Sequence, residues 1–319
     1  MQLNLESTNY NHISKVVDKT NERIELIRSG KLKPLVTSSR KEKEKIGGLY
    51  PTDQMVLAAR TGMGKTAKVI HMMRDFVDPR INPHYNGKLI ILYDTWEMAD
   101  FRSVLRMYSR EAQMTVKQLL DFQNTITEEQ FTRLKLIGDS FKGYPIYMSQ
   151  ISQSVNAWKK QKIEITNKYP KHTIVNIVDH TRLVSRDNEG SEEQLISKFM
   201  MAGMKIKNDY EHINIFLSQM NRNIESGARG RDDIGKNTPV SSDIFGSDSV
   251  FQCADIVMAL HRPGFYGLTS WEDIPTGINP NNPDQYDHLM IECILKQRDG
   301  WTGNLMMRHN LGFNQIEDY

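Results

Sequence analysis

The stretch Ala59-Arg60-Thr61-Gly62-Met63-Gly64-Lys65-Thr66 decides the fold of this chain. It follows a short apolar run, Met55–Ala59, and precedes a segment whose apolar residues recur at helical spacing. A strand, a glycine-containing turn, Gly-Lys-Thr and a helix, in this order, are the context of a phosphate-binding loop. Backbone N–H groups of such a turn converge on an anion, and the glycines let the backbone approach it closely. All eight residues are therefore predicted to bind nucleotide.

Two side chains of this loop carry the expected nucleotide chemistry. Lys65 would bring positive charge to the β- and γ-phosphates, and the Thr66 hydroxyl would coordinate Mg²⁺. ATP and Mg²⁺ are therefore the predicted cofactors. The loop departs from the usual pattern at its first position, where Ala59 stands in place of Gly. Because alanine is small, we expect no loss of binding.

Apolar runs of about five residues recur after residue 47, separated by helical or polar stretches. Such runs are typical of parallel strands buried on both faces, so we expect an α/β fold with a mostly parallel sheet flanked by helices. The runs are Met55–Ala59, Leu89–Tyr93, Ile174–Val178, Ile213–Leu217 and Ile256–Leu260. Two more, Leu289–Leu295 and Asn304–Arg308, are joined by a short connection with two glycines and predict a C-terminal β-hairpin.

Residues 1–46 are predicted to form an N-terminal helix and a basic linker. The helix is indicated by apolar residues at helical spacing, namely Ile13, Val16, Val17, Ile24 and Ile27. Gly30 follows as a natural helix stop. Residues 31–46 are polar and basic, so we expect a linker or exposed loop with solvated charges. One nucleotide-binding domain is expected to occupy residues 47–319.

Composition restricts the class of protein. Of 319 residues, 39% are apolar and 25% are charged, which is ordinary for a globular protein. The formal net charge is only +2, so a nucleic-acid site would need local clustering of charge. Cys253 and Cys293 lie in apolar runs without metal-ligand spacing and predict reduced core thiols. No stretch resembles a signal sequence or a membrane span, so we expect a cytoplasmic protein.

Polar residues follow three of the predicted strands. Asp179, after Ile174–Val178, is placed to hold the Mg²⁺ shell. Glu97, after Leu89–Tyr93, could polarise the attacking water, or it could be an acid favoured at a helix N-terminus. Gln219 could sense the γ-phosphate, or it could be an ordinary polar strand end.

Lys296 and Arg298 lie at the tip of the predicted hairpin. Side chains two residues apart on a strand point the same way. They would suit a charge clamp on a phosphate supplied from a neighbouring subunit, and an ordinary basic turn is the alternative. Two stretches, Asn221–Ser242 and Arg262–Asp287, read as mobile loops or insertions.

Taken together, these stretches resemble the C-terminal domain of the bacterial and phage replicative DNA helicases, the DnaB family. The similar segments occur in the family's order: Gly47–Gln54 with the phosphate loop, Trp96–Met98, Ile177–His180, Ser218–Arg222, Gln252–Met258 and Lys296–Gly300. The resemblance implies a RecA-like P-loop NTPase core. It also implies that Glu97 is the catalytic base, that Asp179 is the Walker B acid and that Arg298 is a finger acting in trans.

The same resemblance implies a function. It is an ATP-dependent replicative DNA helicase that translocates 5′–3′ on single-stranded DNA as a hexameric ring, with a primase or a helicase loader as candidate partners. The early amphipathic helix would be the linker helix that packs on the adjacent subunit. The family also has a helical N-terminal domain, for which this sequence leaves no room. Ser242–Asp248 lacks the Arg-Glu pair that the family usually has there.

The loop after Gln219 is predicted to bind single-stranded DNA. Its basic residues outnumber its acidic ones by one, and they are Arg222, Arg229, Arg231 and Lys236. Because the loop begins at the candidate γ-phosphate sensor, the state of ATP could move it. A merely solvated loop is the alternative, with Arg182 and Arg186 as the next candidates for the DNA path.

Two other functions stay open. One is a RecA-like recombinase, against which the Lys296 and Arg298 pair and the early helix argue. The other is a nucleotide-binding ring scaffold without unwinding activity. The altered Ser242–Asp248 stretch favours the scaffold slightly. The residues that disfavour it are Lys65, Glu97, Asp179 and Arg298, because a scaffold needs neither a catalytic base nor a finger.

Overall fold

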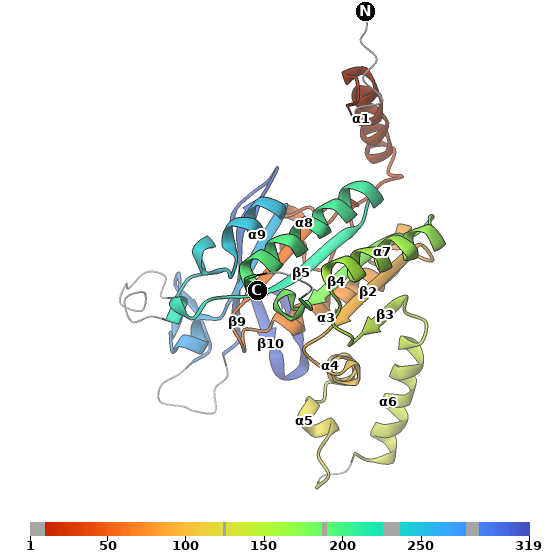
Figure 1. Cartoon of the computed structure of the whole chain (residues 1–319). Helices are drawn as coiled ribbons and strands as arrows, with labels where there is room; N and C mark the ends of the chain where they lie inside the picture. The colour runs from red at the N-terminus through yellow and green to blue at the C-terminus, as the bar shows by residue number, and fades with distance from the viewer. Residues whose placement is uncertain (1–9, 124–125, 187–189, 226–236, 279–286) are drawn as a thin grey trace, which may run out of the picture.

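The computed structural model describes residues 10–123, 126–186, 190–225, 237–278 and 287–319. Within these residues, a nine-stranded sheet has the order β11-β10-β9-β6-β1-β5-β4-β2-β3 (Figure 1). Six strands from β6 to β3 pair in parallel, and β9, β10 and β11 extend the sheet with antiparallel pairs. The strands are β1 (Gln54–Ala59), β2 (Leu89–Thr95), β3 (Ile146–Ser149), β4 (Thr173–Asp179), β5 (Ile213–Gln219), β6 (Ile256–His261), β9 (Leu289–Gln297), β10 (Gly303–Asn310) and β11 (Gln315–Asp318). The predicted α/β fold, parallel sheet and C-terminal hairpin are confirmed.

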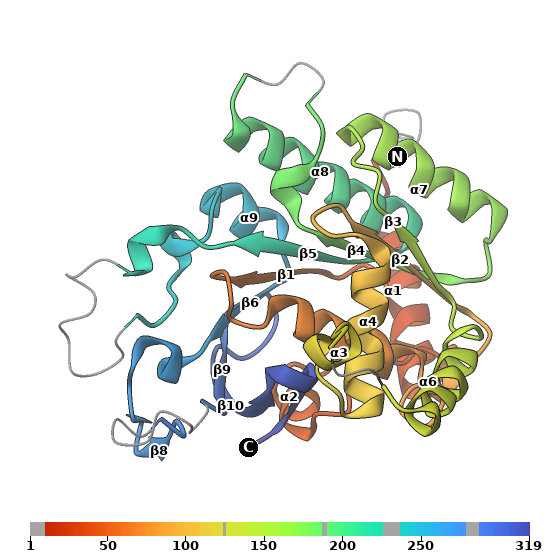
Figure 2. The ribbon, with the colours of Figure 1, turned by 90° about the horizontal axis from the view of Figure 1, so that it is seen from below.

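Helices cover both faces of the sheet (Figure 2). The sequence of strand β1 is continuously apolar because both of its faces are buried. Leu57 lies in the same core as Phe76 of α3, and Val56 lies in a second core with Phe199 of α8. Alternate residues thus enter opposite cores, as expected for a parallel strand between two helical layers. The longer helices are α1 (Ile13–Arg28), α3 (Lys65–Val77), α4 (Asp100–Ala112), α6 (Glu128–Phe141), α7 (Val155–Lys168) and α8 (Glu192–Tyr210), and the shorter ones are α2 (Arg40–Lys45), α5 (Val116–Leu119) and α9 (Ser247–Cys253).

The predicted N-terminal helix is confirmed as α1. None of its residues is buried, and it stands away from the sheet (Figure 1). Its apolar side chains, including Ile13 and Ile24, are exposed to solvent. The helix therefore presents an apolar face that nothing else in the described chain covers.

The prediction of an exposed linker over residues 31–46 is wrong at four buried positions, Leu35, Thr37, Ser39 and Glu42. Leu35 is fully buried and exchanges two backbone hydrogen bonds with Leu49. In α2, Glu42 is buried and pairs with Lys68 of α3. The charge run suggests solvation because the sequence does not show that Lys68 lies inside the domain, where a buried ammonium needs a carboxylate.

Other differences concern short elements. The predicted loop Arg262–Asp287 contains a 3₁₀ turn, Pro263–Tyr266, and a small hairpin of β7 (Ser270–Trp271) and β8 (Ile274–Pro275). The predicted loop Asn221–Ser242 has 3₁₀ turns at both ends, and its residues 226–236 lie outside the description. Strands β3 and β11 escaped prediction because each has four residues and lies at a sheet edge.

The two cysteines are free and buried, as the apolar context of each predicted. Burial raises the pKa of the Cys293 thiol to about 12. Among the described helices, none has the length and apolar character needed to cross a membrane.

Candidate nucleotide-binding site

Four strand ends build the site. Because β1, β2, β4 and β5 are mutually parallel, their carboxyl ends lie at one edge of the sheet. The stretch Ala59–Thr66 follows β1, Glu97 follows β2, and Asp179 and Gln219 are the last residues of β4 and β5. The residues predicted separately from sequence are thus brought to one edge by the topology.

The loop between β1 and α3 has the backbone geometry that its glycines allow. Gly62 and Gly64 have φ values of 84° and 95°, in the left-handed region that favours glycine. At Gly64 an added Cβ would also lie 2.9 Å from side-chain carbons of Leu311 and Met290. Helix α3 begins at Lys65, so its first free N–H groups face the loop. This is an anion-binding arrangement.

Lys65 lies among the acidic residues of the site. Its Nζ donates a hydrogen bond to the Ser218 carbonyl at 3.3 Å. Burial lowers the pKa of Lys65, and the charges of Asp179 and Glu97 oppose that shift. An ammonium whose charge is incompletely compensated by the protein is suited to a phosphate ligand.

Asp179 is buried and has spare acceptor capacity. Its Oδ2 accepts a hydrogen bond from the Tyr93 hydroxyl at 3.3 Å, whereas its Oδ1 is buried without a hydrogen-bond partner. Burial raises the pKa of the Asp179 carboxyl, and Lys65 opposes this shift. An unpaired buried carboxylate oxygen fits a cation, and Thr66, the second residue of α3, supplies a hydroxyl. These donors would hold Mg²⁺ together with phosphate oxygens.

No group of three or more His, Cys, Asp or Glu side chains with metal-binding geometry occurs in the described part of the chain. A site for Mg²⁺ agrees with that finding, because Mg²⁺ is usually held by one or two carboxylates, waters and substrate phosphates.

Glu97 lies outside the following helix. Helix α4 has Ala99 as its N-cap and Asp100 as the acid of its first turn, so Glu97 does not occupy the alternative position weighed from the sequence. Its side chain is 54% exposed and lies 3.8 Å from Nε2 of His180. Burial lowers the pKa of His180, and the charge of Lys65 lowers it further. Glu97 is thus an accessible carboxylate at the mouth of the site.

Side-chain contacts of Gln219 and Glu225 also join the loop to the strand β5 side. Gln219 Nε2 donates to the Thr61 hydroxyl at 3.0 Å. Arg60 forms a two-pronged ion pair with Glu225, with 2.8 Å from Nε to Oε1 and 3.1 Å from Nη2 to Oε2. Both contacts link the candidate phosphate loop to the segment that leads into the predicted DNA-binding loop.

Sequence reasoning missed Arg262, which also reaches the loop. Its Nη1 donates to the Gly62 carbonyl at 2.7 Å, and its Nε pairs with Asp287 at 2.9 Å. Arg262 directly follows β6, so the strand-end rule that found Asp179 would have found it too. Its position in an apparent insertion obscured that signal.

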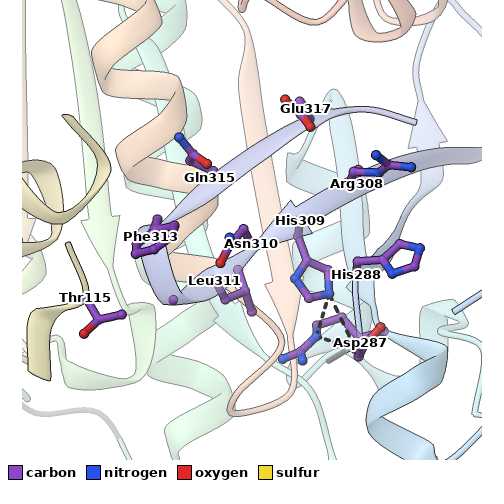
Figure 3. Close-up of a pocket in the computed structure, with 12 residues that line it drawn as sticks. Thr115, Asp287, His288, Arg308, His309, Asn310, Leu311, Phe313, Gln315 and Glu317 are labelled. Atoms are coloured by element: carbon purple, nitrogen blue, oxygen red, sulfur yellow. Dashed lines mark hydrogen bonds and ion pairs between the residues drawn. The ribbon is translucent and has the colours of Figure 1, made fainter. Parts of the chain in front are cut away.

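A cavity of about 900 Å³ opens beside this arginine (Figure 3). His309 and Asp287 approach each other in it, with 3.4 Å between Nε2 and Oδ2, and burial lowers the pKa of His309. Leu311, which packs near Gly64, lines the same cavity. Leu311 and Arg262 thus lie between the cavity and the phosphate loop.

Lys296 and Arg298 lie at the opposite edge of the sheet. Strand β9 runs antiparallel to β6, and its end, Gln297, pairs with Ile256 at the start of β6. Lys296 Nζ donates to the Phe251 carbonyl of α9, and Arg298 Nε pairs with Asp255 at 3.2 Å. The structure thus does not bring these cations to the phosphate loop of their own chain.

The predicted DNA-binding residues are only partly described. Arg222 is exposed at the start of its loop, and Arg229, Arg231 and Lys236 lie outside the described residues. Of the next candidates, Arg186 is exposed, whereas Arg182 pairs with Glu192 and lies over the Phe245 ring. Arg182 is therefore already engaged by an acidic partner.

Comparison with known proteins agrees with this arrangement. A family model described as the DnaB-like helicase C terminal domain matches residues 35–318. The replicative DNA helicase DnaB of Geobacillus stearothermophilus is 24% identical over 316 residues, which cover 96% of this chain and 62% of that protein. A protein of Trieres chinensis named as a probable replicative DNA helicase is 24% identical over 277 residues, covering 85% of this chain and 54% of that protein. This chain thus spans only part of the length of these relatives.

Solved structures show the same fold. One, described as an ATPase domain, superposes with a TM-score of 0.79 at 18% identity, covering 98% of this chain and 100% of that one. A DnaB-like replicative helicase, studied with its interactions with primase, gives a TM-score of 0.77 at 18% identity, covering 98% of this chain and 68% of that one. The RecA-like architecture expected from the sequence is confirmed. With a family match over residues 35–318, this chain belongs to the DnaB-like helicase C-terminal domain family.

Proposed function

We propose that this chain binds and hydrolyses ATP with Mg²⁺ and uses the energy to translocate on single-stranded DNA and separate strands. The observation that carries the proposal is the meeting of Lys65, Asp179 and Glu97 at one sheet edge, where the charges of both acids act on the pKa of Lys65. Lys65 would bind the β- and γ-phosphates, and Thr66 and Asp179 would hold the metal. Glu97 would orient and deprotonate the attacking water.

The cavity beside Arg262 would receive the base and ribose of the nucleotide. It lies next to the phosphate loop, has a volume of about 900 Å³, and is lined by apolar Leu311 and Phe313 as well as polar groups. Apolar side chains could pack on a planar base, and the polar ones could hydrogen-bond to the base and the ribose. Arg262 would bridge the two parts, since it contacts both the loop and Asp287.

The position of Arg298 supports hydrolysis in a ring of identical subunits. Strand β1 has six residues, Gln54–Ala59, and Arg298 lies beside its start while the phosphate loop follows its end. At about 3.3 Å per residue, the strand alone separates them by on the order of 20 Å. Arg298 would therefore act on the nucleotide of an adjacent subunit, which requires a head-to-tail interface and suits a closed ring.

Helix α1 would form part of that interface. Its exposed apolar face needs a cover, and a second copy offers an apolar cavity of about 360 Å³ on α4. The cavity is lined by Phe101, Val104, Leu105, Tyr108, Met148 and Asp100. We place α1 of one subunit against this surface of the next, in a hexamer of the kind that the family resemblance implies. Such a ring would work in the cytoplasm with a primase or a loader.

Strand displacement on a forked DNA tests the proposal. The parent chain should release the labelled strand in the presence of ATP and Mg²⁺, and Lys65→Ala should not. ATP turnover without displacement would instead support the ring scaffold, and strand exchange between homologous duplexes would support the recombinase. Forks with only a 5′ or only a 3′ tail would establish the direction of movement.

A further inference from the structure

In the described part of the chain, the main partner of Arg298 is Asp255. Its backbone N–H donates to the Asp255 carbonyl at 2.8 Å, and its Nε lies 3.2 Å from Asp255 Oδ1. The Arg298 side chain is 52% exposed, whereas that of Asp255 is only 12% exposed. A solvent-facing guanidinium is thus attached at two points to a nearly buried anchor.

Asp255 is itself fixed by three contacts with two residues. Its Oδ2 accepts a hydrogen bond from the backbone N–H of Gln54, at 2.8 Å, and pairs with the ammonium of Lys207 on α8. Its own backbone N–H donates to the Gln54 carbonyl at 2.8 Å. Because these partners belong to β1 and α8, the carboxylate cannot shift without disturbing the core. The other carboxylate oxygen, Oδ1, is therefore held in a fixed position, where it contacts Arg298.

The contact leaves donors of Arg298 for another ligand. A guanidinium has five N–H donors in a planar fork, and Asp255 engages the Nε edge. Nη2 approaches the Gln252 carbonyl only at 3.5 Å, which is a weak contact. Because the side chain is half exposed and Nη2 has only this weak contact, the terminal nitrogens stay available to a further ligand.

The contact should do little for folding. Ion pairs with a half-exposed partner contribute little to stability, because water screens the charges and side-chain entropy opposes the fixed geometry. The value of the arrangement lies in the geometry that it imposes. A catalytic group that is misplaced by about 1 Å can slow a reaction by up to about 10²-fold.

We infer that Asp255 is the positioning residue that orients Arg298 toward the nucleotide of the neighbouring subunit. This inference rests on the proposed function, in which Arg298 acts in trans. Asp255 does not touch the nucleotide itself. It holds the guanidinium by Nε and thereby aims the terminal nitrogens at a phosphate.

The test is a double-mutant cycle on ATP turnover. Arg298→Ala should lower kcat by about 10³-fold or more, as expected for loss of an arginine finger. Asp255→Asn keeps an acceptor for Gln54 but lacks the charge, and it should lower kcat by about 10- to 100-fold with the KM for ATP unchanged. In the double variant, kcat should equal that of Arg298→Ala, because the anchor has nothing left to hold. An Asp255→Asn effect that persists in full in the Arg298→Ala background would overturn the inference.

Two further variants separate positioning from stability. Asn82→Ala removes buried hydrogen bonds to Val36 and Asp75, none of which involves Asp255 or Arg298, so it should lower the melting temperature and leave kcat near the parent value. Asp255→Glu keeps the charge but displaces the carboxylate by one methylene, so it should reduce kcat and serves if Asp255→Asn does not fold. Parent-like kcat in folded Asp255→Glu and Asp255→Asn would refute the role of Asp255. Parent-like kcat in Arg298→Ala would instead refute the finger, and with it the proposed function in trans.

Discussion

Lys68 and Glu292 form an ion pair with 2.6 Å between Nζ and Oε1, and neither side chain is exposed to solvent. Glu42 of α2 approaches the same ammonium, also at 2.6 Å. Lys68 lies one turn beyond Lys65 on the phosphate-loop helix, Glu292 lies on the strand that ends near Arg298, and α2 follows α1. This cluster therefore connects the helix that follows the phosphate loop with the strand that leads to Arg298 and with α2.

Lys68→Met should destabilise the domain strongly. Removing the ammonium would leave two buried carboxylates without a counter-charge, and breaking a buried pair in this way costs about 3–5 kcal/mol. Denaturant unfolding at neutral pH measures the change. A matched exposed pair is Lys160 and Glu164 on α7, where Lys160→Met should change the free energy of unfolding by less than about 1 kcal/mol. Equal effects of the two variants would contradict the structural role of the cluster.

Glu292→Gln should remove part of the pH dependence of stability. Burial raises the pKa of the Glu292 carboxyl to about 7, with Lys68 opposing, so the folded state holds a proton that the unfolded state releases near pH 4.5. The folded state therefore loses stability from this group as pH rises from about 4.5 through about 7. Glutamine resembles the protonated form and should flatten this slope. An unchanged slope in Glu292→Gln would show that Glu292 is ionised throughout this range.

Lys65→Ala should abolish tight ATP binding. The substitution removes the charge that faces the β- and γ-phosphates, and charge-assisted hydrogen bonds are the strongest polar contacts available to them. Equilibrium binding of a fluorescent ATP analogue measures the loss, with an unchanged melting temperature as the control for folding. Parent-like affinity would exclude Ala59–Thr66 as the phosphate site.

Glu97→Gln should separate binding from hydrolysis. Nucleotide affinity and assembly should persist, because Glu97 is an exposed side chain at the mouth of the site. Turnover should fall by about 10²–10⁴-fold, the usual effect of losing a general base. Glu193→Gln, an exposed acid in the first turn of α8, is the matched control and should leave turnover near the parent rate. Similar rates for both variants would reduce Glu97 to a surface acid.

The site could be predicted because its residues follow apolar strands. Residues that are buried by long-range packing could not be predicted. Asp179 and Gln219 follow apolar runs, and parallel strands carry such residues to one edge whatever the distance along the chain. Glu42 lies in a charged run that predicts exposure to solvent, but in the fold it is buried against Lys68. No local sequence pattern predicts a partner that lies 26 residues away.

The sequence predicts part of the position of Arg298. The hairpin and its basic tip follow from the sequence, and the structure confirms the hairpin. The hairpin tip lies beside Asp255, at the edge of the sheet where the parallel strands begin. This position depends on the antiparallel pairing of β9 with β6. Pairing partners of strands are set by the whole fold, so no spacing in the sequence encodes this.

Glu225→Gln should uncouple DNA binding from ATP turnover. Glu225 receives a two-pronged ion pair from Arg60 of the phosphate loop, and it stands where the described chain enters the predicted DNA-binding loop. Paired N–H donors fix both the distance and the plane of the carboxylate, so a change in the loop backbone would be passed on to the segment after Gln219. Glutamine cannot accept on both atoms.

The expected result is a basal ATP hydrolysis rate near that of the parent, because Glu225 touches neither nucleotide nor metal in the proposed site, together with a loss of stimulation by single-stranded DNA. DNA affinity should fall with a salt dependence similar to the parent, since Glu225 contributes no phosphate contact. Glu164→Gln, an exposed acid on α7 with a lysine partner, is the matched control and should be stimulated normally. Full DNA stimulation in Glu225→Gln would mean that the ATP state reaches the DNA path by another route, for which the Gln219 contact to Thr61 is the next to be tested.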